Sequence, residues 1–327
     1  MIHKNVIKSL VMGAAVLGST LAFAADPFPS KPIKMVVPFA AGGPTDIVAR
    51  LMAQAMSTDL KQQVIVENVG GAGGTVGAGQ VARAAPDGYT VLLHHIGQAT
   101  SPALYRNLPY KPTEDFAPIG LVNEVPMTLV AKKDFPAKDL KELIQHVKTN
   151  KDKVTYANAG LGAASHLCGM LFMSAIDTAV TTVPYKGTGP AMNDLLGGQV
   201  DFMCDQTTNT TSQIKADKVK VYGVTTKSRV PSLPNVPTMN EAGMPGFEVS
   251  IWHALYAPKG TPKPVVDRLN KALVAALKDE NVKTRFAELG TEPVPVNRAT
   301  PEVLAKHLKA EIDKWAPVIK KAGQFAD

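Results

Sequence analysis

The sequence lacks the motifs that mark several common enzyme classes. It contains no G-x-x-x-x-G-K-[ST] phosphate loop, no G-x-S-x-G nucleophile motif and no H-E-x-x-H zinc motif. The only two cysteines, Cys168 and Cys204, do not match the spacing of a zinc site, and no second cysteine or histidine pair completes one. We therefore expect no cofactor, no bound metal and no enzymatic activity.

Long apolar runs and basic clusters are also missing. After residue 24, no segment approaches the roughly 18 unbroken apolar residues of a membrane-spanning helix. The 35 lysines and arginines exceed the 28 aspartates and glutamates only mildly, and they form no block with interleaved aromatic residues. The sequence thus predicts no nucleic-acid partner. A mild positive excess is usual for a solvated surface, although it is also compatible with a weak preference for anionic ligands.

The N-terminus has the pattern of a secretory signal peptide over residues 1–24. Lys4 and Lys8 supply positive charge, Ser9–Phe23 is mostly apolar, and Ala22–Ala24 is a small-x-small cleavage site. Cleavage there predicts a protein of the periplasm, which argues against free nucleotides as ligands. An uncleaved N-terminal anchor is the alternative.

The cysteine pair has two interpretations in that compartment. In an oxidising environment two cysteines favour a disulfide, which here would close a loop of about 36 residues and stabilise the fold by about 3–4 kcal/mol in the chain-entropy model. Two buried free thiols are the alternative, and the sequence leaves both open.

Short β-branched runs alternate with amphipathic segments, which predicts α/β domains with parallel sheets. The length suits two such domains. Strands are expected over residues 33–37, 64–66, 89–93, 154–157, 180–183, 200–204 and 219–224. Helices are expected over residues 45–61, 163–176, 189–196, 210–215, 262–278 and 301–321, with a further one ending at residue 85.

The last two expected helices are followed by no strand-rich domain, so they must pack on a domain already formed. Returning the chain to the first domain requires two crossovers, which we place at 119–130 and 248–256. This organisation is typical of a two-lobed solute-binding protein, in which closure of a hinge traps a ligand. We assign residues 25–124 plus 253–327 to lobe 1 and residues 125–252 to lobe 2.

Glycine-rich turns join strands to helices where the two lobes would face each other. Gly42–Asp46 follows the first strand, Asn158–Ser165 follows a strand of lobe 2, and Pro184–Pro190 is a third such turn. The first N–H groups of a helix have no intrahelical acceptor, so a helix that starts after a parallel strand can bind an anion. Two facing turns could therefore clamp a small dicarboxylate. An ordinary strand-to-helix turn, which also needs glycine, is the alternative.

Polar residues at strand ends are further candidates for ligand contact. His94 and His95 end the third strand on opposite faces; one is expected to enter the cleft, and we take His94 as the candidate with His95 as the alternative. Asp205 follows a strand and is expected either to cap the next helix or to contact the ligand. Ser165 and His166 are adjacent on a helix and point in different directions, so they form no catalytic dyad.

Gly77–Ala82 fits the dinucleotide pattern G-x-G-x-x-A. It does not directly follow a strand, however, and no acidic residue lies about 20 residues further on to hold a ribose. We therefore expect no dinucleotide.

Ordered segments along the whole chain resemble the Bug family, the extracytoplasmic solute receptors of tripartite tricarboxylate transporters. These segments are residues 29–33, 38–46, 71–77, 85–90, 183–187, 194–201, 234–238 and 257–262. The resemblance implies a type II periplasmic-binding-protein fold, with two doubly wound sheets joined by a two-crossover hinge. It also implies carboxylate ligands held largely by loop backbone and partly through ordered water. The implied partners are the two membrane subunits of the transporter, and we expect a monomer.

The resemblance also implies a set of ligand contacts. In lobe 1 these are Phe39, Ala40, Gly42, Gly43, Pro44, Thr45 and Asp46. In lobe 2 they are Asn158, Gly160, Ala163, Ala164 and Ser165, with Lys186, Gly187 and Asp205 nearby.

Three places depart from the family pattern. Ala41 stands where proline is usual, Val69–Gly70 stands where a basic residue and proline are usual, and His94–Gln98 replaces a loop usually rich in Gly, Ser and Thr. The last departure leaves the ligand open among di-, tri- and aromatic carboxylates and acidic amino acids, since imidazole can serve a second carboxylate or stack on an aromatic ring. Two other functions remain as alternatives: a sensor for a signalling partner, and a secreted hydrolase, for which the sequence offers no nucleophile–base pair.

Overall fold

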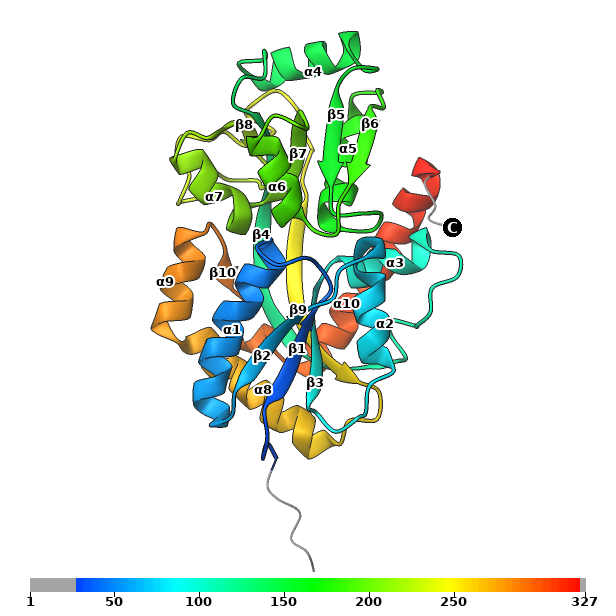
Figure 1. The fold of residues 1–327 in the computed structure, drawn as a ribbon, viewed down its shortest axis with the longest axis vertical. Helices are drawn as coiled ribbons and strands as arrows, with labels where there is room; N and C mark the ends of the chain where they lie inside the picture. The colour runs from blue at the N-terminus through cyan, green and yellow to red at the C-terminus, as the bar shows by residue number, and fades with distance from the viewer. Residues whose placement is uncertain (1–27, 324–327) are drawn as a thin grey trace, which may run out of the picture.

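The structure is a computed structural model that describes residues 28–323, so the expected signal peptide lies outside the described residues. The chain folds into two lobes connected by two long strands, β4 (Phe116–Lys132) and β9 (Ser250–Pro258) (Figure 1).

Lobe 1 contains β1 (Ile33–Val37), α1 (Pro44–Leu60), β2 (Val64–Asn68), η1 (Ala72–Gly74), α2 (Thr75–Ala82), β3 (Thr90–His95), α3 (Gly97–Leu104), α8 (Lys263–Lys278), α9 (Glu280–Glu288), β10 (Glu292–Pro293), η2 (Val296–Arg298) and α10 (Pro301–Ala322). Lobe 2 contains α4 (Leu140–Thr149), β5 (Thr155–Asn158), α5 (Ala164–Ala175), β6 (Thr181–Pro184), α6 (Thr188–Leu196), β7 (Phe202–Gln206), α7 (Thr207–Lys215) and β8 (Val219–Val224).

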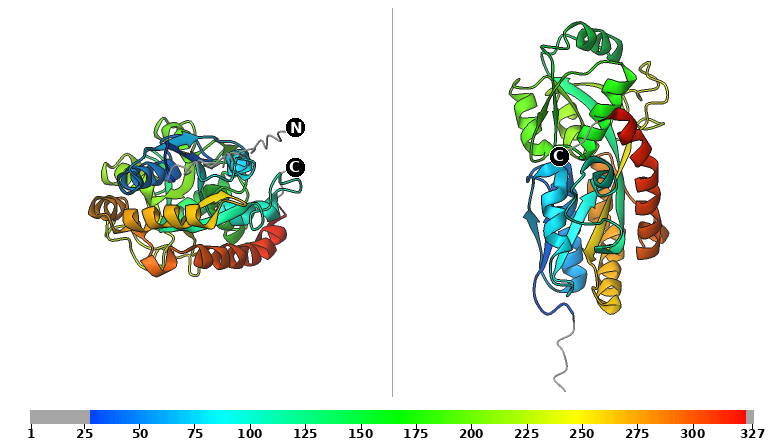
Figure 2. Two further views of the ribbon diagram at one scale, coloured as in Figure 1. Left: turned by 90° about the horizontal axis from the view of Figure 1, so that it is seen from below. Right: turned by 90° about the vertical axis from the view of Figure 1, so that its right-hand side faces the viewer.

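The sheet of lobe 1 has the strand order β2-β1-β3-β9-β4, parallel through β3 and antiparallel from β9 on. Helix α1 packs on it through buried Val48, Met52 and Met56. The C-terminal helices return to this lobe: α8 contacts α1, and α10 contacts α3 and β4 along the outside of the lobe (Figure 2). The two-lobed α/β fold predicted from the sequence is therefore confirmed.

The sheet of lobe 2 is built on the second half of β4, which pairs antiparallel with β7 and β8, while β7, β5 and β6 are parallel. Its core includes Tyr156, Phe172 and Phe202, whose rings pack edge to face. Cys168 on α5 and Cys204 on β7 form a disulfide, with Cα atoms 6.0 Å apart. The sequence left open a disulfide or two buried free thiols, and the structure contains the disulfide.

Several elements differ from those expected. Helices α3, α4 and α9 were not predicted, α7 begins at Thr207 rather than at residue 210, and α2 ends at Ala82 rather than at residue 85. Helix α4 is a short amphipathic helix whose N-terminus is capped by Asp139, which accepts a hydrogen bond from the N–H of Glu142 at 2.8 Å. Among the described residues, no helix is long and apolar enough to cross a membrane.

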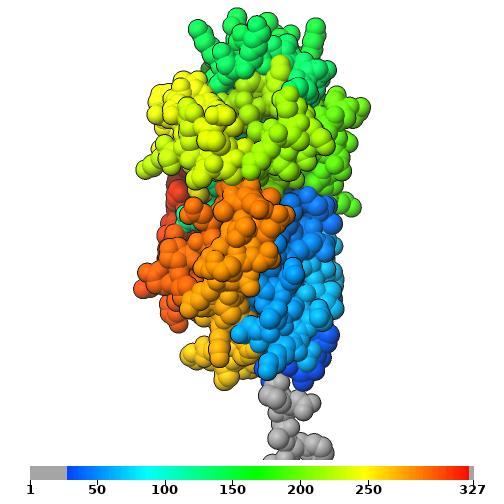
Figure 3. Space-filling view, turned by 90° about the vertical axis from the view of Figure 1, so that its left-hand side faces the viewer, coloured from blue at the N-terminus to red at the C-terminus, as the bar shows by residue number. Residues whose placement is uncertain are grey.

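The two lobes are in contact in this structure. The N–H of Ala40 in lobe 1 donates to the carbonyl of Lys186 in lobe 2 at 2.8 Å, and the Tyr105 hydroxyl donates to the carbonyl of Leu161 at 2.8 Å. On the face drawn in Figure 3, the orange α9 segment and the blue α1 lie directly against the green lobe 2. The structure is thus a closed arrangement of the lobes.

The disulfide generates the first prediction. The double variant Cys168→Ser/Cys204→Ser is expected to lose about 3 kcal/mol of unfolding free energy, because the unfolded chain regains the freedom of the loop that the bond closes. Urea unfolding of the two proteins checks this, with the reduced wild-type protein as a control that should match the variant. Two free thiols, found by mass spectrometry in protein taken from the periplasm, would contradict the bond itself.

Candidate ligand-binding site

A small cavity with a volume of about 10 Å³ lies between the lobes at the carboxyl ends of their parallel strands. Its wall consists of Phe39, Gly43, Pro44, Thr45, His95, Ala159, Ala163, Ala164, Ser165, Thr188, Asp205 and Gln206. Of the residues that the structure describes, no lysine or arginine belongs to this wall. Among the described residues, no three His, Cys, Asp or Glu side chains gather closely enough to hold a metal ion.

Four helices begin at this cavity. Gly43 and Thr45 belong to the start of α1, Ala163 to the start of α5, Thr188 to the start of α6, and Gln206 is the residue before α7. The first N–H groups of each helix lack intrahelical acceptors, and each helix dipole places partial positive charge at its N-terminus. The cavity is therefore suited to an anion, which it would bind through backbone groups and without a cationic side chain.

Asp46 was expected to contact the ligand, but its carboxylate faces away from the cavity. Its oxygens accept hydrogen bonds from the N–H of Gly42 at 3.0 Å, Nε of Arg50 at 2.9 Å and Nδ2 of Asn68 at 2.9 Å. Burial alone would raise the pKa of Asp46, but these hydrogen bonds together lower it. The side chain of Asp46 thus holds the Gly42–Gly43 turn in shape.

The corresponding turn of lobe 2 is fixed by neutral groups. The Ser165 hydroxyl lies on the cavity wall and accepts from the N–H of Ala159 at 2.9 Å, while Oδ1 of Asn158 accepts from the N–H of Gly160 at 2.8 Å. Asn158 and Gly160 therefore shape the turn and do not line the cavity.

The histidine expected on the wall was His94, but the structure places His95 there. His95 stacks on Phe39 with ring centroids 4.6 Å apart, and its Nδ1 accepts from the N–H of Gly97 at 2.9 Å. Burial lowers the pKa of His95 to about 3. The ring is therefore neutral and carries its proton on Nε2. His94 is also fully buried, packs on Phe39 and accepts from the N–H of His95 through Nδ1, and it does not line the cavity.

Asp205 and Gln206 supply acceptors to a cavity otherwise suited to an anion. The Asp205 carboxylate is buried and accepts from the N–H of Gln206 at 2.9 Å and from Nδ2 of Asn209 at 2.5 Å. Burial raises the pKa of Asp205 to about 6 in spite of these hydrogen bonds. The amide oxygen of Gln206 is buried and has no hydrogen-bond partner. Asp205 does not cap α7, whose N-cap residue is Gln206.

The remaining expected residues form the contact between the lobes around the cavity. Ala40 and Lys186 hydrogen-bond each other across the lobes, and a Cβ atom on Gly187 would lie 2.9 Å from the nitrogen of Ala40. A Cβ atom on Gly189 would lie 2.8 Å from the carbonyl oxygen of Ala41 and 2.9 Å from the nitrogen of Gly43. Only glycine lets the two backbones approach this closely.

The cavity therefore includes eight of the expected contact residues: Phe39, Gly43, Pro44, Thr45, Ala163, Ala164, Ser165 and Asp205. It also includes four residues that were not among the candidates, namely Ala159, Thr188, Gln206 and His95 in place of His94. Thr188 starts the helix after the third glycine-rich turn and Gln206 ends the strand that carries Asp205, so their positions could have been found by the same reasoning.

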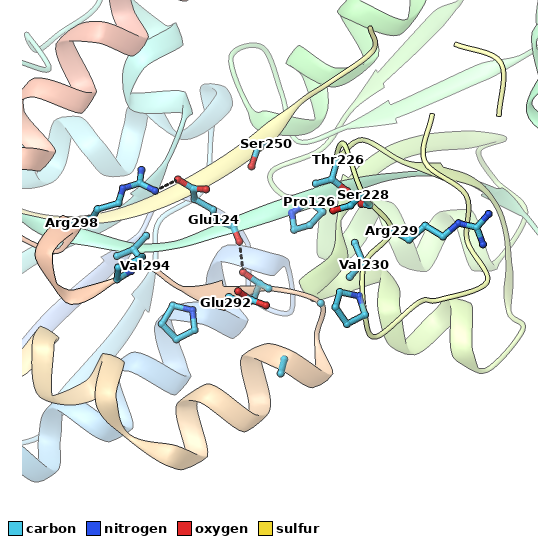
Figure 4. Close-up of a pocket in the computed structure, with 16 residues that line it drawn as sticks. Glu124, Pro126, Thr226, Ser228, Arg229, Val230, Ser250, Glu292, Val294 and Arg298 are labelled. Atoms are coloured by element: carbon cyan, nitrogen blue, oxygen red, sulfur yellow. Dashed lines mark hydrogen bonds and ion pairs between the residues drawn. The ribbon is translucent and has the colours of Figure 1, made fainter. Parts of the chain in front are cut away.

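A larger cavity lies beside the connecting strands, between residues 226–231 of lobe 2 and residues 287–298 of lobe 1 (Figure 4). Two ion pairs lie at this cavity: Arg298 with Glu124 at 2.7 Å, and Arg229 with Glu241 at 2.9 Å. Among the described residues, no α-helix begins at this cavity, so the smaller cavity remains the candidate site.

The fold and this cavity define the chain as a two-lobed periplasmic-type solute-binding protein. It belongs to the tripartite tricarboxylate transporter family receptors, whose pattern it matches over residues 48–324. The protein from the TAR-I ttuE-ttuC' intergenic region of Agrobacterium vitis is 55% identical over 96% of this chain and 91% of its own.

Two solved structures are similar over nearly their whole length. The periplasmic binding protein BugD is 57% identical, with a TM-score of 0.90, covering 92% of this chain and 100% of its own. MatC from Rhodopseudomonas palustris, solved with bound malate, is 44% identical with a TM-score of 0.86, covering 89% of this chain and 100% of its own. The resemblance to Bug proteins found in the sequence is thereby confirmed.

Asp205 generates the second prediction. Its pKa is higher in the folded protein, at about 6, than the ordinary value of 3.8, so the ligand-free fold loses stability as the pH rises between these values. Asp205→Asn cannot ionise and is expected to lack this loss, so its free energy of unfolding relative to that of the wild type should rise by about 3 kcal/mol from pH 4 to pH 7. Denaturant unfolding at both pH values checks this. An equal difference at both pH values would show that the buried charge is not the cause.

Proposed function

We propose that this protein is the periplasmic receptor of a tripartite tricarboxylate transporter. It captures a small carboxylate between its lobes and delivers it to the membrane subunits. The observation that carries this proposal is the convergence of four helix N-termini on one buried cavity that no lysine or arginine lines. Membership of the receptor family and the malate bound to MatC support the same ligand class.

In this proposal, lobe 1 comprises residues 25–124 plus 253–327 and lobe 2 comprises residues 125–252, and export removes residues 1–24. The ligand binds first to N–H groups at the start of α1 or of α5 and α6. Closure about β4 and β9 then brings the second set of N–H groups to its other end and excludes water. Gly43, Thr45 and Ser165 contact the ligand, while Asp46, Asn158 and Gly187 shape the turns that do so.

Two other functions use the same site differently. A sensor would bind the same ligand but pass the closed state to a signalling protein; neighbouring genes for transporter subunits or for a lone sensor kinase distinguish the two. A secreted hydrolase would need a base beside Ser165. The Ser165 hydroxyl accepts a hydrogen bond from the N–H of Ala159, a backbone donor that cannot act as a base, so the receptor is favoured.

A thermal-shift screen tests the ligand class. The protein without its signal peptide is heated with mono-, di-, tri- and aromatic carboxylates after any co-purified ligand has been removed. An acid present at about 100 times its dissociation constant should add about 2.7 kcal/mol of stability and raise the melting temperature visibly. A panel in which no carboxylate shifts the melting temperature would contradict the proposal.

The contact between the lobes can be tested separately with Gly189→Ala. The added methyl group would lie within 3.0 Å of three backbone atoms of lobe 1 in the closed protein, but it is compatible with the helix in an open one. We expect an affinity loss of about tenfold or more, measured by calorimetry with the best acid of the screen. Gly197→Ala, at the other end of α6, is the matched control and should bind normally. Equal affinity in both variants would exclude this contact from the bound state.

A further inference from the structure

The turn between β5 and α5 of lobe 2 inserts its tip into lobe 1. Gly160 and Gly162 in this turn have positive φ angles of 95° and 84°, a conformation that glycine adopts readily. A Cβ atom on Gly73 of lobe 1 would clash with the carbonyl group of Leu161, and a Cβ atom on Gly162 would lie 3.3 Å from Cδ1 of Leu104. The tip therefore lies between η1 and α3 of lobe 1.

Two hydroxyl groups of lobe 1 bind the carbonyl groups of this tip. The Tyr105 hydroxyl donates to the carbonyl of Leu161 at 2.8 Å, and the Thr100 hydroxyl donates to the carbonyl of Gly162 at 2.8 Å. The Thr100 hydroxyl lies farther, at 3.4 Å, from the carbonyl oxygen of Gly97 in its own helix. Burial raises the pKa of Tyr105 to about 12, so the phenol keeps the proton that it donates. We call these two hydroxyls and the two carbonyls that they bind the latch.

The latch is connected to the wall of the ligand cavity in both lobes. In lobe 2, Ala159 and Ala163 lie on either side of the latched tip and line the cavity. In lobe 1, His95 lines the cavity and accepts from the N–H of Gly97, the first residue of the helix that carries Thr100. Neither hydroxyl of the latch belongs to the described wall, so the latch joins the lobes beside the ligand without contacting it.

We propose that Thr100 and Tyr105 determine how long a bound ligand is retained, because their hydroxyls hold the lobes closed. The inference rests on the proposed function and deepens it. When the lobes separate, water can satisfy the two carbonyls of the latch; when the lobes meet, these hydroxyls replace the water. Loss of a hydroxyl therefore raises the free energy of the closed state and leaves the open state, which captures the ligand, unchanged. The dissociation rate should rise while the association rate changes little.

Release of a radiolabelled acid into an excess of the same unlabelled acid tests the latch. L-malate is the first probe, and the best acid of the thermal-shift screen is the second. Tyr105→Phe and Thr100→Val should each release the acid about tenfold faster than the wild type, because each variant leaves one carbonyl without its donor. The double variant should release it faster than either. A misfolded fraction would lower the number of binding sites without changing the release rate.

Two further variants control for other effects of these substitutions. Tyr110→Phe is the matched control, because the Tyr110 hydroxyl lies 3.5 Å from that of Ser101 within its own lobe, and its loss should leave the release rate unchanged. Thr100→Ser restores a hydroxyl and should return the release rate to near that of the wild type.

The outcomes separate the latch from the receptor function. Since the latch does not contact the ligand, each variant should accelerate the release of two different acids by the same factor. A wild-type release rate in Tyr105→Phe or in Thr100→Val would overturn the role of that residue, and a factor that differs between acids would overturn the latch. A wild-type protein that binds no carboxylate would instead contradict the proposed function, and the inference with it.

Discussion

The structure depends on bringing two stretches of backbone together across the gap between the lobes. The donors that face the ligand cavity are backbone N–H groups at helix starts, and a backbone group can reach a ligand only if no side chain stands in front of it. Gly43 and Gly189 meet at such a point, where a Cβ atom on Gly43 would lie 3.2 Å from the nitrogen of Gly189. Because glycine has no side chain, these two positions allow the lobes to touch and also leave the N–H groups at the helix starts uncovered.

Charged side chains hold the turns beside the cavity in shape. The carboxylate of Asp46 holds Gly42, Arg50 and Asn68, and the arginine on it is partly exposed at the outer side of α1. A cationic side chain in the cavity would bind any carboxylate strongly but would discriminate little by shape, whereas fixed N–H groups demand a geometry. Asp205 is the exception, a buried acid on the cavity wall whose pKa is raised by burial. Buried titratable groups with shifted pKa values are typical of binding sites, and the position of Asp205 on the cavity wall agrees with that.

Much of the fold could be predicted from the sequence because its strands are short apolar runs separated by glycine-rich turns. Two of the predicted turns lie at the cavity: α1 begins in the turn Gly42–Asp46, and α5 begins in the turn Asn158–Ser165. Helices α3 and α9 were missed because α3 contains Pro102 and α9 has a polar sequence with only Val282 and Phe286 buried, so neither shows a clear apolar period. The choice between His94 and His95 depends on how β3 pairs with its neighbours, which alternation along one strand cannot give.

That pairing is also what joins the cavity to the hinge. In the register of the sheet, His95 on β3 lies opposite His253 on β9, and His253 lies opposite Asn123 on β4. In this row His253 and Asn123 hydrogen-bond each other at 2.9 Å. Asn123 donates to Thr291 at 3.1 Å, and Thr291 donates to the carbonyl oxygen of Glu124 at 2.6 Å. Since β4 and β9 are the strands that connect the lobes, the Thr45 hydroxyl on the cavity wall is hydrogen-bonded directly to one of these strands, through Nε2 of His253 at 3.2 Å. The cavity wall and a connecting strand are therefore joined by a side-chain hydrogen bond, and not only by packing of the apolar core.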